Sequence, residues 1–70
     1  MGNDFKDILK DFLCEKNLTQ VAFASKIGVK QSQVSEWLSG KAKPGYDILR
    51  RISIAFDISA DYLLGITEFY

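Results

Sequence analysis

Residues 20–40 read Q-V-A-F-A-S-K-I-G-V-K-Q-S-Q-V-S-E-W-L-S-G, and this segment is the most specific indication of the fold. Two helices that pack at about 90–120° need a small residue where they cross and a glycine in the short turn between them. Ala24 and Gly28 satisfy these two needs. Apolar side chains must also hold the two helices together, and suitable ones stand at Phe23, Ile27, Val29, Val34 and Trp37. The stretch therefore predicts a pair of short helices, the second running from about Gln31 to Leu38 and ending at Gly40.

The residues before this stretch predict a further helix. Apolar side chains recur with the i, i+3, i+4, i+7, i+8 spacing of one buried helical face, at Phe5, Ile8, Leu9, Phe12 and Leu13. Asn3 or Asp4 can cap this helix, which we expect to run to about Lys16. Thr19 is the expected N-cap of the next helix, whose apolar face would combine Val21 with Phe23, Ala24 and Ile27.

The residues after it predict two more helices. Lys41 to Gly45 should form a loop, and a fourth helix follows on the apolar positions Tyr46, Ile48, Leu49, Ile52, Ala55 and Phe56. Ser59 is a good N-cap for a fifth helix, packed through Tyr62, Leu63 and Leu64 and ended by Gly65. The chain is thus expected to be all-α, a compact five-helix bundle in which residues 1–70 form one domain.

Composition removes several classes of function. The 70 residues include a single cysteine, Cys14, and no histidine, so a Cys-based zinc site and the familiar nucleophile–histidine pairs are excluded. We expect no enzyme, no catalytic or metal-binding residue, no cofactor and no small-molecule substrate. No apolar run approaches the ~20 residues that span a bilayer, and no signal-peptide pattern opens the chain. We therefore expect no membrane association and a cytoplasmic location.

The net charge is zero, but the charge is unevenly distributed. Residues 1–15 carry four acids and two lysines, and residues 52–70 carry three acids and no base. Residues 16–51 carry seven bases against two acids, a net of +5. This distribution suggests a basic face with acidic flanks, which suits a partner rich in phosphate.

The helix pair resembles the helix-turn-helix domains of the lambda-repressor, Cro and XRE family. The resemblance covers residues 4–65 and rests on four motifs: L-T-Q at 18–20, Q-S…V at 31, 32 and 34, V-S-E-W-L-S-G-K-A-K-P at 34–44, and I-S-A-D-Y-L-L-G at 58–65. It implies a lambda-repressor-like fold in which the third helix enters the DNA major groove and the second crosses the sugar–phosphate backbone.

The outward positions of the third helix are short or medium polar side chains, with both donors and acceptors of hydrogen bonds. We expect these residues to read base edges: Gln31, Ser32, Gln33, Ser35 and Glu36. Glu36 could instead pair with a nearby lysine when no DNA is bound. The expected phosphate contacts come from residues at the ends of the two helices: Gln20, Lys30, Lys41 and Lys43. Lys30 stands where a Ser or Thr cap would be more usual.

We expect a transcriptional regulator, a repressor of phage or XRE type. Because one helix pair reads few base pairs, it should act as a homodimer on a two-fold symmetric double-stranded operator with half-sites about 34 Å apart. The apolar tail at residues 66–70 could pack on the core, form part of the dimer interface, or begin a linker. The alternative function is a protein-interaction module, such as an antitoxin component with the same fold.

Overall fold

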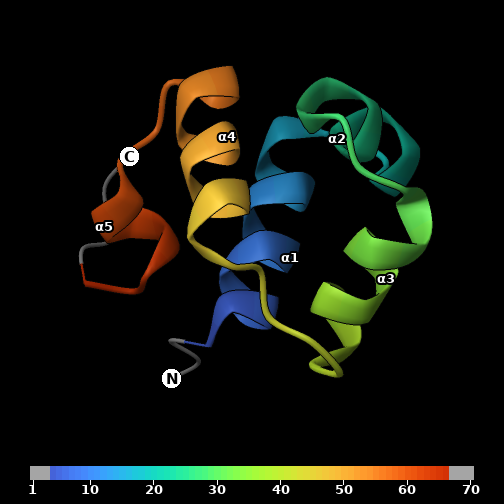
Figure 1. The fold of residues 1–70 in the computed structure, drawn as a ribbon, viewed down its shortest axis with the longest axis horizontal. Coiled ribbons are helices and arrows are strands. Elements are labelled where there is room, and N and C mark those ends of the chain that lie inside the picture. The colour runs from blue at the N-terminus through green and yellow to red at the C-terminus, as the bar shows by residue number, and fades with distance from the viewer. Residues whose placement is uncertain (1–3, 67–70) are drawn as a thin grey trace.

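The computed structural model describes residues 4–66, and the regular secondary structure in that range is all α-helix (Figure 1). The predicted all-α fold is confirmed, with helix ends within about one residue of those expected. The five helices are α1 (Phe5–Lys16), α2 (Gln20–Ile27), α3 (Gln31–Ser39), α4 (Tyr46–Phe56) and α5 (Ala60–Leu63).

Side chains and left-handed residues set the ends of the helices. The Thr19 hydroxyl accepts a hydrogen bond from the Ala22 N–H at 3.0 Å, and Ser59 caps α5 in the same way. Gly28 ends α2 with φ 75°, a conformation that costs glycine little. Asn17 and Asp57 end α1 and α4 in the same left-handed region, which the sequence patterns did not predict. Short polar side chains tolerate this conformation better than other non-glycine residues.

The core is built largely of aromatic rings contributed by different helices. Phe56 of α4 stacks on Phe23 of α2, with ring centres 5.2 Å apart, and meets the edge of Phe12 from α1 at 5.3 Å. At the other end of α1, Phe5 packs edge-on against Trp37 of α3 at 6.2 Å. Both Phe23 and Val34 are fully buried. Among the described helices, α3 packs against α1 and α2, α4 packs against α2, and α5 packs against α4 and α1 (Figure 1).

Some expected core positions are wrong. Val21, Tyr46 and Leu64 were assigned to apolar faces, yet they are 63%, 78% and 55% exposed. Each stands at or near a helix end, where the helix extends past the neighbours that would cover it. Ile66 is also exposed, so this first residue of the tail does not pack on the core. The rest of the tail lies outside the described residues.

Candidate nucleic-acid interface

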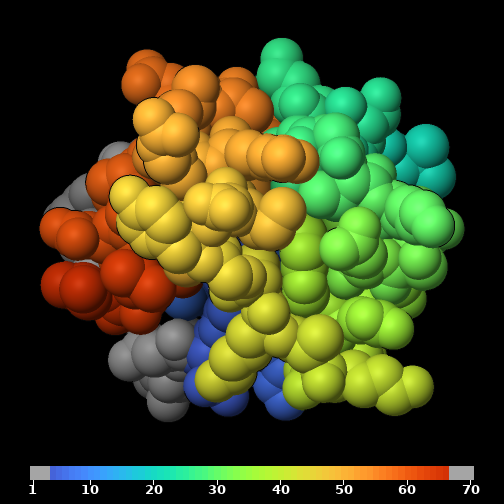
Figure 2. Space-filling view, in the orientation of Figure 1, coloured from blue at the N-terminus to red at the C-terminus, as the bar shows by residue number. Residues whose placement is uncertain are grey.

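The outer face of α3 is polar and open to solvent. Val34 and Trp37 are buried against the other helices, so the opposite side of α3 faces solvent. The five expected base-reading residues are all exposed on it: Gln31, Ser32, Gln33, Ser35 and Glu36. Figure 2 shows the green surface of α3 beneath that of α2 along the right side of the view. The structure thus brings these five residues together on one accessible helix.

A side-chain hydrogen bond links the starts of α2 and α3. The amide nitrogen Nε2 of Gln31 donates to Oε1 of Gln20 at 3.0 Å. The bond leaves Gln31 one amide N–H and its carbonyl oxygen, and leaves Gln20 its amide N–H groups. Gln31, which is expected to read a base, and Gln20, which is expected to contact a phosphate, therefore orient one another.

No hydroxyl side chain caps the start of α3. Lys30 is the N-cap residue, and its ammonium group cannot accept a hydrogen bond. Instead, Oε1 of Gln33 accepts a bond from the Lys30 backbone N–H at 3.2 Å. This is the reciprocal half of a capping box. The amide oxygen of Gln33 is therefore turned back toward the helix start, while the Lys30 side chain is left exposed.

Two exposed lysines follow the C-terminal end of α3. Gly40 adopts φ 81°, and the Lys41 N–H then bonds to the Glu36 carbonyl at 3.0 Å. Lys41 and Lys43 are exposed, whereas Ala42 between them is half-buried. The loop is therefore anchored through Ala42 while its charged side chains remain accessible.

The charged side chains of this surface are unpaired within residues 4–66. Lys30, Lys41, Lys43 and Glu36 form no salt bridge with another described residue. The pairing considered for Glu36 in the absence of DNA is therefore not present among them. Unpaired charges at an exposed surface are available to a charged partner.

Two cations near this surface were not among the residues expected to contact DNA. The Arg51 guanidinium reaches over the turn between α2 and α3, where its Nη1 lies 3.9 Å from the position of a Cβ built on Gly28. Lys6 of α1 lies beside Gly40 at the end of α3. Both placements depend on how helices distant in sequence pack, and no local pattern marks either residue.

Away from this surface, the described residues include a tyrosine with a shifted pKa and an exposed cysteine. Burial raises the pKa of Tyr62 above its ordinary value of 10.0, and nearby Glu15 and Asp11 add to the increase. Cys14 is an exposed free thiol. Between residues 4 and 66, no group of acidic, histidine or cysteine side chains is arranged to hold a metal ion. None of the helices in this range has the length and apolar character needed to cross a membrane.

Comparison with known proteins agrees with this geometry. A family model described as helix-turn-helix matches residues 9–63. The chain is 36% identical over 62 residues to the HTH-type transcriptional activator BcrR of Enterococcus faecalis, covering 89% of this chain and 30% of that protein. It is 37% identical over 60 residues to the uncharacterized HTH-type transcriptional regulator YqaE of Bacillus subtilis, covering 86% of this chain and 52% of that one.

The chain spans about half the length of one of these curated relatives and less than a third of the other. No solved structure gives a significant match. The family match covers most of the chain, and the five-helix fold agrees with it. The chain belongs to the helix-turn-helix family of lambda-repressor and XRE type.

Proposed function

We propose that the chain is a DNA-binding domain that recognises a specific double-stranded sequence by placing α3 in the major groove. The observation that carries the proposal is the exposed polar face of α3, whose first side chain is oriented by the hydrogen bond that Gln31 donates to Gln20 of α2. A major groove about 12 Å wide admits one α-helix. The similarity to regulators of transcription supports the same function.

Within this proposal, Gln31 is the strongest base-reading residue. It keeps a carbonyl acceptor and an amide donor, the pair that matches N6 and N7 of adenine. Ser32 and Ser35 can donate to or accept from several bases, and Glu36 can accept from N4 of cytosine. Gln33 contributes amide N–H groups, because its oxygen already serves the start of α3.

Phosphate contacts complete the proposed interface at both ends of the helix pair. At the start of α2, the amide N–H groups of Gln20 that face away from Gln31 suit a phosphate oxygen. Lys30 precedes α3, while Lys41 and Lys43 follow it, so exposed ammonium groups stand at both ends of the reading helix. These contacts contribute affinity that weakens with salt and carries no sequence information.

We further propose that two copies bind a two-fold symmetric operator in the cytoplasm and repress transcription there. Half-sites of such operators repeat about every 34 Å. The described body measures 27 × 24 × 23 Å, so two copies fit side by side at that spacing. Repression needs only occupancy of a promoter. A reporter gene placed behind the selected site distinguishes repression from activation, the activity named for the Enterococcus faecalis relative.

Selection from a randomised pool of duplex DNA tests the proposal. The expected result is enrichment of one two-fold symmetric sequence whose binding constant falls with salt, at a logarithmic slope of about −0.9 per phosphate contact. A Gln31→Ala variant should lose preference at one base pair of each half-site. A Ser25→Ala variant, altered at an exposed position of α2, should keep the whole preference. Absence of any enriched sequence at low salt, with the chain shown to be folded, would overturn the proposal and favour the protein-interaction module.

A further inference from the structure

Lys6 of α1 lies against the end of the proposed reading helix. Gly40 has no side chain, and Lys6 occupies the space that one would fill. Its Cδ lies 3.1 Å and its Nζ 3.6 Å from the position of a Cβ built on Gly40. The first turn of α1 therefore lies beside the start of the loop that follows α3.

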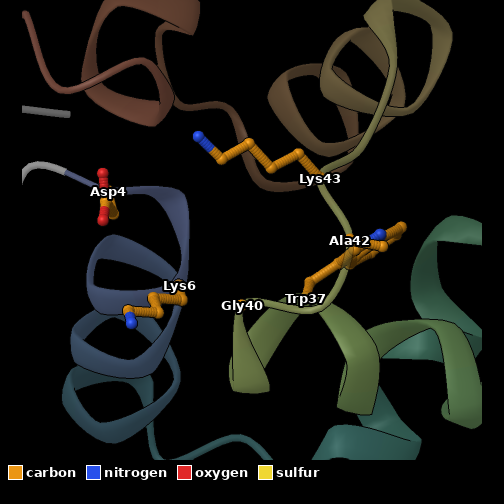
Figure 3. Close-up of a pocket in the computed structure, with 6 residues that line it drawn as sticks. All are labelled: Asp4, Lys6, Trp37, Gly40, Ala42 and Lys43. Carbon is orange, nitrogen blue, oxygen red and sulfur yellow. The ribbon is translucent and has the colours of Figure 1, made fainter.

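A small hollow separates these two segments. Its volume is about 70 Å³, and its lining comprises Asp4, Lys6, Trp37, Gly40, Ala42 and Lys43. Figure 3 shows the Lys43 side chain extending from the loop toward Asp4, which immediately precedes α1, while Lys6 comes from the first turn of that helix. The hollow thus lies between Lys43, which is already proposed to contact phosphate, and Lys6 of α1.

The charges around the hollow are two ammonium groups and one carboxylate. Neither lysine forms a salt bridge with another described residue, and the Asp4 side chain makes no capping hydrogen bond to α1. All three residues are exposed. The hollow is therefore net positive, and its positive charges are not satisfied from within residues 4–66.

We propose that this hollow receives one phosphate of the DNA backbone, contacted by Lys6 from α1 and by Lys43 from the loop. The inference rests on the proposed function, because α3 must be in the groove for a backbone phosphate to reach this position. It makes Lys6 an additional phosphate-binding residue. In the same proposal, the Asp4 carboxylate repels the phosphate, and this repulsion lowers the affinity for every DNA sequence by the same factor.

The test compares single variants on the duplex selected with the unaltered chain. Lys6→Met keeps an unbranched stem over Gly40 and removes the charge, so we expect the salt slope to become shallower by about 0.9 with no change in base preference. Asp4→Asn removes the opposing charge, and its affinity should rise about two- to fivefold at low salt. Lys26→Met, altered at an exposed lysine in the last turn of α2, is the control and should keep the original slope.

The outcomes separate the two proposals. If the chain selects a DNA sequence but Lys6→Met keeps the full slope, or Asp4→Asn gains no affinity, the phosphate hollow is refuted and the proposed function stands. If no sequence is selected by the folded chain, the proposed function fails and the hollow fails with it. Thermal unfolding of each variant confirms that the comparison is made between folded proteins.

Discussion

The two glutamines at the start of α3 should behave differently when each is replaced by alanine. Gln31 presents a free oxygen and a free N–H, because only one of its amide protons is used by Gln20. Gln33 has its oxygen turned toward the Lys30 N–H at 3.2 Å. A bidentate bond to adenine needs the oxygen and nitrogen of one amide aimed at the same base edge. Only Gln31 has both available in the structure.

The magnitudes follow from these bonds. A good bidentate contact is worth about 1–3 kcal/mol, so Gln31→Ala should weaken binding to the selected site by about 5- to 150-fold. The variant should also bind with nearly equal affinity whichever of the four base pairs stands at one position of the half-site. Gln33→Ala removes a capping interaction worth about 0.5–1 kcal/mol. It should lower the melting temperature by about 2 to 8 °C and relax base preference much less than Gln31→Ala does, because only the amide N–H groups of Gln33 are lost from the reading face.

The assay is a set of binding titrations with each base pair of the selected half-site replaced in turn, alongside thermal unfolding monitored by circular dichroism. A cycle with Gln20→Ala adds a check on the hydrogen bond between the two helices, since residues in direct contact show non-additive effects. An equally strong relaxation of one base position by Gln33→Ala and by Gln31→Ala would refute this difference between the two glutamines. Additive effects of Gln20→Ala and Gln31→Ala would contradict the role given to their bond.

Three further predictions concern stability. Gly40→Ala should lower the free energy of unfolding by about 1 kcal/mol or more, because a Cβ is strained at φ 81° and would crowd Lys6; denaturant titration measures this, and an unchanged midpoint would contradict it. Thr19→Ala should cost about 1 kcal/mol through the lost cap, and Thr19→Ser should restore most of it in the same titration. The raised pKa of Tyr62 means that folding favours the protonated phenol, so stability should decline as pH rises through and beyond 10.0. Tyr62→Phe should flatten that part of the pH profile, and an equally steep profile would exclude Tyr62 as the cause.

The helices could be predicted because their signals are local. Thr19 and Ser59 cap the helices that follow them, and Gly28 and Gly40 end theirs, as expected from a few neighbouring residues each. The left-handed ends at Asn17 and Asp57 were missed. Asparagine and aspartate occur in many conformations, so their presence does not mark a left-handed residue as glycine does.

Burial was predicted less well than helix position. Periodicity identifies the face of a helix that turns inward, but it does not show where the neighbouring helices end. Val21 and Tyr46 have apolar side chains at the starts of α2 and α4, where no neighbour covers them. The middle positions, such as Phe23 and Ile52, are fully buried as expected.

The site was predicted as a set of residues, and its internal contacts were not. The hydrogen bond from Gln31 to Gln20 joins residues eleven positions apart, and it depends on the angle at which the two helices cross. The position of Lys6 over Gly40 depends in the same way on how α1 packs against α3. The assignment of Gln31, Ser32, Gln33, Ser35 and Glu36 to base reading remains a prediction.

Nuclear magnetic resonance with ¹⁵N-labelled protein tests most directly whether α3 is the surface that meets DNA. The measurement is a titration with the selected duplex, following backbone amides and the side-chain amides of Gln20 and Gln31. We expect the largest shifts at Gln31, Ser32 and Glu36, with the Gln20 and Gln31 side-chain signals moving at the same duplex concentration. Shifts confined to α4 and α5, with the α3 signals unmoved at saturating duplex, would contradict it.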